Sequence, residues 1–310
     1  MKASRTHWSI DLIGGCFGIA IALGLVRFDF GIIGNLMADA QWIDVEDIGT
    51  LAAINMFGYL TGCIQQATVK SRATSIRYVQ IAMITIIASI VLEGRSTNLP
   101  SQSVLRLLCG WGAAHVVSGL PTLALERVPQ RWRRKATGLI MSGGGIGSLL
   151  GAVGIGLFAP TSAPSAWIVL ATLTVVLSLP TLALLRQRKQ LPTPASETLT
   201  DSTNQTISNF NKRKINQLIL IIILGFALMQ IGQIPVILYE PLIAVNKIGL
   251  TPMMASNIDS LFGIGLIIGG VIPSIVPSKL TTSLFLAVIA AVGLAGMILF
   301  GISNHLITLS

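Results

Sequence analysis

Charged residues are scarce in this sequence of 310 residues. They make up 11% of it, hydrophobic residues make up 52%, and the mean hydropathy is +0.77. Soluble domains carry roughly 25% charged residues, so this deficit excludes an ordinary soluble domain. The apolar runs do not alternate with polar residues, which excludes the strands of a membrane barrel. The composition predicts an all-α polytopic membrane protein, with the lipid bilayer as its surroundings.

Cysteine and histidine are also rare, with three of each. Cys16, Cys63 and Cys109 lie in apolar runs without metal-binding or disulfide spacing, so we expect small buried hydrophobes. The sequence shows no nucleophile–base pair and no metal constellation. Its glycine-rich stretch SGGGIGSLLG, residues 142–151, lacks the lysine of a nucleotide-binding loop. We therefore expect no enzyme, no cofactor and no metal, and no ATP-driven transport by this chain alone.

The formal net charge is +9, but the basic residues do not gather on one face that would suit a nucleic acid. Most of them occupy alternate segments between the apolar runs. Acidic residues cluster in the first segment on the other side, at Asp39, Asp44, Glu46 and Asp47. The positive-inside rule then places the N-terminus in the cytoplasm. We expect a multi-pass protein of the bacterial cytoplasmic (inner) membrane, a plasma membrane, with a retained first span.

Nine apolar runs are long enough to cross a bilayer, because a spanning helix needs about 20 apolar residues. They cover residues 12–36, 47–69, 77–93, 101–126, 136–159, 165–185, 216–239, 252–275 and 280–302. The polar stretch 188–215 predicts a cytoplasmic linker, since it is rich in Ser, Thr, Pro and Asn. It divides the chain into a six-helix N-terminal half, residues 1–187, and an incomplete C-terminal half of three helices, residues 216–310.

A weak internal repeat connects the two halves. An offset of 205 residues maps Phe57 and Gly58 in the second span onto Phe262 and Gly263 in the eighth. Parallel repeats of six helices build one large class of transporters. The same offset would start a tenth helix near Ser310, so the C-terminal half is expected to be short, either because the product is truncated or because the repeat is partial.

Several motifs resemble those of the major facilitator superfamily. The fourth span carries Arg106, Gly110 and Gly112 in the pattern Arg-x-x-x-Gly-x-Gly, and the segment LERVPQRWRRKATGLIMSGGGIGSLLG follows it. The stretches GLVRFDFG, residues 24–31, and NMFGYLTG, residues 55–62, resemble the uncharacterised bacterial YbfB/YjiJ-type branch. The resemblance covers about residues 10–300. It departs from the family in three ways: the loop after the second span lacks the usual Asp, the fifth span lacks the Gly-Pro pair of the antiporters, and nine spans stand in place of twelve.

The resemblance implies a helical bundle whose first, fourth, seventh and tenth helices line a central cavity. It therefore places Arg27 and Arg106 on the cavity wall, where two cations would favour an anionic substrate. The alternative is that either arginine snorkels to the interface or forms a structural ion pair. In the seventh span, Gln230 and Gln233 share a face beside a Gly-Pro break and are candidates for substrate contact.

Three ionisable residues inside spans, Asp29, His115 and Asp259, are candidates for coupling transport to protons, since such residues are costly in a membrane and often functional. Asp29 lies about 200° around the helix from Arg27, so it needs another partner, and Arg106 is the best candidate by depth. For His115 an interhelical hydrogen bond is the favoured alternative. For Asp259 an interfacial position is favoured.

Glycines recur every four residues in two spans, at Gly143, Gly147 and Gly151 in the fifth and at Gly265 and Gly269 in the eighth. Such faces allow close helix approach. In the superfamily, helices five and eight meet across the two halves, so we expect these faces to form a sliding contact. The alternative is ordinary packing within one half.

Together these observations predict a monomeric secondary active transporter of the major facilitator type. It would move a small solute, with an anion favoured, by alternating access. Protons are the candidate coupling ion. The alternative from another class is a truncated, non-transporting membrane protein or a degenerate transporter remnant.

Overall fold

The computed structural model describes the N-terminal half almost completely and the C-terminal half in part. The described residues are 5–159, 161–190, 220–221, 224–225, 228, 231–232, 234, 236–240, 243–245, 249–275, 284, 287–296 and 298–299. Throughout these residues the regular elements are helices, without a strand. The chain is therefore an all-α protein, as its composition predicts.

The first span is one long rod in three pieces. These are α1 (Arg5–Ile19), the π-helix η1 (Ala20–Phe28) and α2 (Phe30–Asp39). The next three spans are α3 (Val45–Ala67), α4 (Arg72–Glu93) and α5 (Leu99–Leu125). The fifth is divided at Ser142 into α6 (Gln130–Met141) and α7 (Gly143–Phe158), and α8 (Ala163–Gln190) is the sixth. In the C-terminal half, α11 (Pro252–Ile275) occupies the range predicted for the eighth span.

Six of the described helical segments are long and apolar enough to cross a membrane. They are Trp8–Asp39, Arg72–Glu93, Leu99–Leu125, Gln130–Phe158, Ala163–Lys189 and Met253–Ile275. The helix α3 is not among them, although its 23 residues are long enough. The seventh and ninth predicted spans and the linker 188–215 lie partly or mostly outside the described residues. The multi-pass architecture is therefore confirmed, while the count of nine spans is not.

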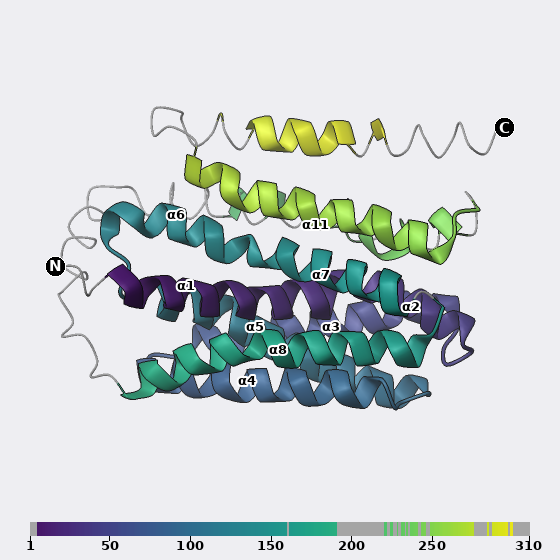
Figure 1. The fold of residues 1–310 in the computed structure, drawn as a ribbon, viewed down its shortest axis with the longest axis horizontal. Coiled ribbons are helices and arrows are strands. Elements are labelled where there is room, and N and C mark those ends of the chain that lie inside the picture. The colour runs from purple at the N-terminus through teal and green to yellow at the C-terminus, as the bar shows by residue number, and fades with distance from the viewer. Residues whose placement is uncertain are drawn as a thin grey trace.

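The helices run nearly parallel to the long axis of the molecule (Figure 1). Glycines set their closest contact, between α3 and α5. A β-carbon at Gly110 would lie 1.9 Å from the carbonyl oxygen of Asn55, and one at Gly58 would lie 2.2 Å from the carbonyl oxygen of Leu107. Because no side chain could fit there, these glycines bring the two backbones into direct contact.

The helix α7 lies between the N-terminal bundle and α11 (Figure 1). On one face, a β-carbon at Gly147 would lie 2.0 Å from the carbonyl oxygen of Ala20 in η1. On another face, a β-carbon at Gly145 would lie 2.4 Å from the carbonyl oxygen of Gly263 in α11. Thus the fifth and eighth spans do meet, and glycines on both of them permit it.

The glycines that make this contact differ from the predicted ones. The face with four-residue spacing packs on the first span, which was the alternative of packing within one half; its members are Gly143, Gly147 and Gly151. In α11, a β-carbon at Gly265 or Gly269 would meet no atom of the described chain within 4 Å. A regular spacing identifies a glycine face but not the neighbour it meets, and α7 has two such faces.

A network of charged residues joins the ends of four helices at the N-terminal end of α1. Nη2 of Arg188 in α8 donates to Asp11 of α1 at 2.5 Å. Nε of Arg188 lies 3.6 Å from the carboxylate of Glu126, the residue that ends α5. The same carboxylate accepts two hydrogen bonds from Arg72 of α4, at 2.8 and 3.0 Å. The network thereby ties the first and last helices of the N-terminal half together.

Candidate functional site

The site is built around the π-helix in the first span. At its end, the backbone N–H of Asp29 donates to the carbonyl of Gly24, five residues earlier, at 3.1 Å. π-Helical segments are rare in proteins. Those that do occur often lie at functional sites. Gly24 is required there by the approach of α7, because a β-carbon would lie 2.4 Å from the backbone nitrogen of Ser148. The π-helix thus carries Arg27 through its last turn while it lies against α7.

A cavity of about 730 Å³ opens beside this segment. Its wall is mostly apolar. The lining residues are Leu23, Val26, Arg27, Phe28, Phe30, Gly31, Gly49, Ala52, Ala53, Asn55, Met56, Tyr59, Arg106, Val117, Ile234, Ile237, Leu238, Tyr239, Phe262 and Leu266. They come from the first, second and fourth spans, from the predicted seventh span and from α11. The cavity therefore lies where the two halves meet.

Two contacts close the wall between the halves. The rings of Phe28 and Phe262 meet edge to face, with centroids 5.3 Å apart. A β-carbon at Gly49 would lie 2.7 Å from the hydroxyl of Tyr239, so α3 accepts that tyrosine only because residue 49 is glycine. Residues of the predicted seventh span thus line the cavity.

Arg27 lines this cavity and is half-buried. Its guanidinium carbon lies 5.9 Å from the ring centroid of Phe28, and it is close enough to Tyr59 to interact with it electrostatically. Across the part of the chain that the structure describes, it forms no ion pair and no hydrogen bond through its side chain. Its charge is therefore available to a ligand in the cavity.

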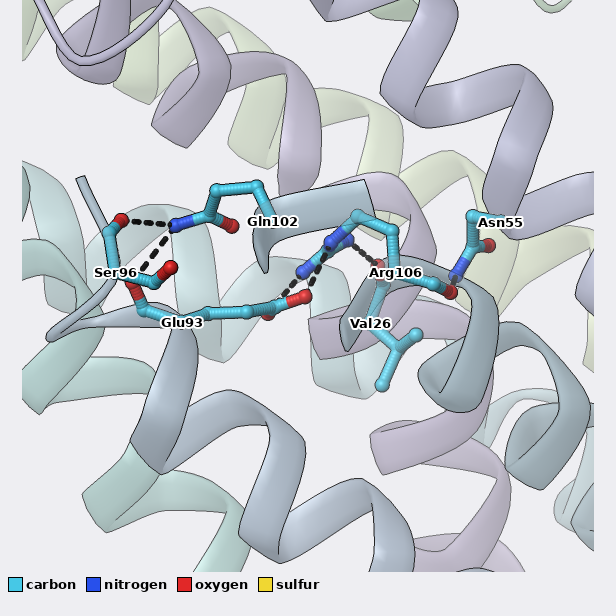
Figure 2. Close-up of polar contacts among 6 residues, drawn as sticks. All are labelled: Val26, Asn55, Glu93, Ser96, Gln102 and Arg106. Atoms are coloured by element: carbon cyan, nitrogen blue, oxygen red, sulfur yellow. Dashed lines mark hydrogen bonds and ion pairs between the residues drawn. The ribbon is translucent and has the colours of Figure 1, made fainter. Parts of the chain in front are cut away.

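Arg106 is placed differently, although it also reaches the cavity wall. Its side chain is almost fully buried, and Nε donates to Oε1 of Glu93 at 2.6 Å while Nη2 donates to Oε2 of the same carboxylate. Nη1 donates to the carbonyl of Val26 at 3.0 Å (Figure 2). The guanidinium also lies over the rings of Phe30 and Trp167. Arg106 thus holds α4, α5 and η1 together.

The expected pair between Arg106 and Asp29 is therefore wrong. The partner of Arg106 is Glu93 instead of Asp29. Glu93 is the last residue of α4 and lies thirteen residues before Arg106, so the short turn into α5 brings the two side chains together. The bidentate bond to Glu93 compensates the arginine charge. The observed geometry corresponds to the structural ion pair that was the alternative for this residue.

Neighbouring amides fix this ion pair in place. The side chain of Gln102 donates to the carbonyls of Glu93 at 2.8 Å and of Ser96 at 2.6 Å. The side chain of Asn55 in α3 donates to the carbonyl of Arg106 at 2.9 Å (Figure 2). Asn55 therefore links α3 to α5 by a hydrogen bond. An acidic residue at the end of an apolar run was the sequence signal that could have identified Glu93.

Asp29 points away from the cavity, toward α7. Its side chain is fully buried, and a β-carbon at Gly151 would lie 1.6 Å from Oδ2 of the carboxylate. Neither carboxylate oxygen has a hydrogen-bond partner among the described residues. The carboxylate interacts electrostatically with Asp259 of α11. Arg27 therefore faces the cavity, whereas Asp29 faces α7. The angular separation of these two residues around the helix predicts such different environments.

Asp259 is buried within the protein, with 2% of its surface exposed. It lies one helical turn after Ser256, whose hydroxyl donates to the carbonyl of Ala152 in α7 at 2.5 Å. Its Oδ2 has no hydrogen-bond partner in the described chain. The structure therefore brings two of the three coupling candidates, Asp29 and Asp259, to the same stretch of α7, from the side of the first span and from the side of α11.

His115 is buried elsewhere, among α3, α4 and α5. Nδ1 lies 2.7 Å from the amide oxygen of Gln66, and Nε2 lies 3.0 Å from that of Gln65. Its ring stacks on Tyr78 and meets Trp111 edge to face. These contacts correspond to the interhelical hydrogen bonding that was favoured for His115. The two glutamines predicted to contact substrate, Gln230 and Gln233, lie outside the described residues.

Comparison with known protein families gives a match over most of the chain. The model of a family described as uncharacterised MFS-type transporter YbfB matches residues 19–309. This confirms the resemblance drawn from the motifs in the first, second and fourth spans. No curated protein matches the chain. The alternative function, that of a truncated or degenerate protein that does not transport, is not better supported than transport.

Proposed function

Because the chain belongs to the major facilitator superfamily, it is a multi-pass membrane transporter, and we propose that it carries a small organic anion. Its branch of the superfamily is described as uncharacterised MFS-type transporter YbfB. The anion binds in the cavity beside Arg27. The single observation that carries this proposal is the free guanidinium of Arg27 on a mostly apolar wall.

The charge of Arg27 is the reason to propose an anion. A cation inside a membrane is costly unless a partner compensates it. Arg106 has such a partner in Glu93, whereas Arg27 has none in the described chain. A bound carboxylate or sulfonate would supply the missing charge, and the planar guanidinium suits two-point bonding to such groups.

The rest of the wall is the reason to propose an apolar part. Apart from its two arginines, Asn55 and the hydroxyls of Tyr59 and Tyr239, the lining is aliphatic, aromatic or glycine. The volume of about 730 Å³ is typical of sites for small organic molecules. A substrate with one anionic group and an apolar body would match both features.

The position of the cavity supports transport by alternating access. Residues from both halves line it, and α11 packs on α6 and α7 beside it. Rocking of one half against the other would expose such a midplane site to each side in turn. With the N-terminus in the cytoplasm, as the basic segments predict, α6 begins on the cytoplasmic side.

The test is a binding screen with a panel of small model compounds. Thermal unfolding of the purified protein is followed with benzoate, hexanoate and benzenesulfonate, and with benzamide, hexanamide and benzylamine as neutral and cationic counterparts. Ligands that bind only the folded state raise the unfolding temperature. We expect anions alone to do so, and proteoliposome uptake of the best anion then measures transport.

Two variants make the screen specific. In Arg27→Gln the anion-induced shift is expected to disappear, while the unfolding temperature without ligand stays the same or rises. Arg95→Gln is the matched control, since Arg95 is an exposed arginine in the turn after α4. Equal shifts with benzoate and benzamide, or an unchanged benzoate shift in Arg27→Gln, would show that Arg27 does not select the ligand.

A further inference from the structure

Two buried carboxylates lie near the boundary between the N-terminal half and α11 and interact electrostatically. Asp29 belongs to the first span and Asp259 to α11, and both approach the same stretch of α7. The Oδ2 of Asp29 fills the space beside Gly151, while Ser256, one turn before Asp259, bonds to the adjacent Ala152. Both carboxylates lie outside the cavity lining. They therefore form a separate site behind the cavity wall.

A buried hydroxyl also belongs to this site. Ser148 of α7 lies one turn before Gly151, its side chain is fully buried, and it interacts with the carboxylate of Asp29. Within the described chain its Oγ forms no hydrogen bond of normal geometry. Buried polar groups normally have such partners. Three buried polar side chains from three elements, Asp29, Ser148 and Asp259, thus lie around one stretch of α7.

No cation in the described chain compensates these acids. The helix α7 has no titratable residue in its sequence. On α6, the nearest recorded contact of a basic residue with α11 is from Arg134 to the carbonyl of Pro273, about 21 Å along α11 from Asp259 at 1.5 Å per residue. Arg27 faces the cavity and Tyr59. The further charged group near Asp259 is another acid, Glu240.

Two buried carboxylates that interact electrostatically, without a cation beside them in the described chain, disfavour the doubly ionised form, because each charge raises the cost of the other. A proton on either carboxylate removes one of the two charges and so removes the repulsion between them.

We propose that Asp29 and Asp259 share one proton while α11 is packed on α7, so that this contact takes up a proton when it closes and releases it to water when it opens. This inference rests on the proposed alternating movement of the halves, and it identifies the proton as the ion coupled to that movement. It also predicts that ionisation of the pair at high pH opposes closure through like-charge repulsion.

Closure can be measured with a disulfide, without any substrate. A β-carbon at Gly156 would lie 3.2 Å from Cβ of Ser256, close to the 3.5–4.5 Å typical of disulfides. The pair Gly156→Cys and Ser256→Cys, with Cys63→Ser to remove the half-buried native thiol, therefore reports on the contact between α7 and α11. A protease site in the linker 188–215 shows on a gel whether the halves are joined.

The carboxylates are then neutralised in this reporter. At pH 8.5 we expect Asp29→Asn and Asp259→Asn each to speed cross-linking by about fivefold or more, because neither can carry the repelling charge. At pH 6 the variants and the reporter should agree within about twofold. Comparison at one pH cancels the pH dependence of thiol chemistry. Asp39→Asn, an exposed acid at the end of the same rod, is the matched control and should change nothing.

Each result decides the proposal. Equal rates in the reporter and in both variants at pH 8.5 would overturn it, as would an equal acceleration by Asp39→Asn. If Asp29→Asn does not fold, Asp259→Asn provides the same test. The readout needs no bound anion, so failure here leaves the role of Arg27 standing, and loss of anion binding leaves the proton site standing.

Discussion

At the scale of the residue, the two arginines of the cavity wall differ in how their charge is compensated. Arg106 directs its guanidinium to Glu93 and Val26, whereas Arg27, among the described residues, has the ring of Phe28 and Tyr59 near it. One therefore contributes to folding and the other is free for binding. Sequence alone could not separate them, because both are single arginines in apolar runs.

The ion pair of Arg106 gives the first stability prediction. Glu93→Gln leaves a buried guanidinium without its counter-charge, which in soluble proteins costs about 3–5 kcal/mol. We expect a clear fall in the unfolding temperature of the purified protein. Glu46→Gln, at an exposed acid in the first turn of α3, is the control. An unchanged unfolding temperature in Glu93→Gln would mean that the pair does not hold these helices.

His115 allows a test between a structural and a coupling role. His115→Leu removes both contacts to Gln65 and Gln66, at about 0.5–2 kcal/mol each. We expect a lower unfolding temperature but an unchanged pH dependence of the cross-linking reporter. A shift in that pH dependence would instead make His115 part of proton coupling.

At the scale of the element, helix positions were predictable and helix partners were not. Long apolar runs bounded by polar segments fix where spans begin and end, so α11 occupies its predicted range. The position of the π-helix has no such signal in the apolar pattern. The π-helix lies where α7 packs closely against Gly24, a contact between distant parts of the sequence. The contact between α7 and α11 was predicted, but its glycines were not, since periodicity does not tell which neighbour a face meets.

Two glycines of α11, two residues apart, test this contact. A β-carbon at Gly263 would lie 2.7 Å from the backbone nitrogen of Leu149, whereas one at Gly265 meets nothing described within 4 Å. Gly263→Ala should therefore lower the unfolding temperature and the yield of the cysteine cross-link. Gly265→Ala should be neutral or slightly stabilising, since alanine favours a helix by about 0.5–1 kcal/mol over glycine. The reverse order of stability would rule out this packing.

At the scale of the whole molecule, the N-terminal half is tied together at both ends. The pair of Arg106 and Glu93 lies toward one end, and the network of Arg188, Asp11 and Glu126 at the other. None of these ion pairs crosses the boundary with α11, so movement at that boundary leaves them intact. A rigid N-terminal half suits the rocking motion proposed here.

The network at the end of α8 gives the last prediction. Arg188→Gln removes the charged bond at 2.5 Å to the buried Asp11 and the nearby charge that faces Glu126. We expect the unfolding temperature to fall while benzoate still raises it, because none of these residues lines the cavity. Arg186→Gln, at an exposed arginine two residues earlier on α8, should have no effect. Loss of the benzoate response with retained stability would contradict a purely structural role.

Finally, the contact of Asp29 with Gly151 constrains evolution as well as movement. The carboxylate fills the volume that a side chain at residue 151 would need, so the two positions share one space. Related sequences that keep an acid at position 29 should keep glycine at position 151. Those with a smaller residue at position 29 are free to carry alanine at position 151, and an alignment of the branch would reveal this covariation.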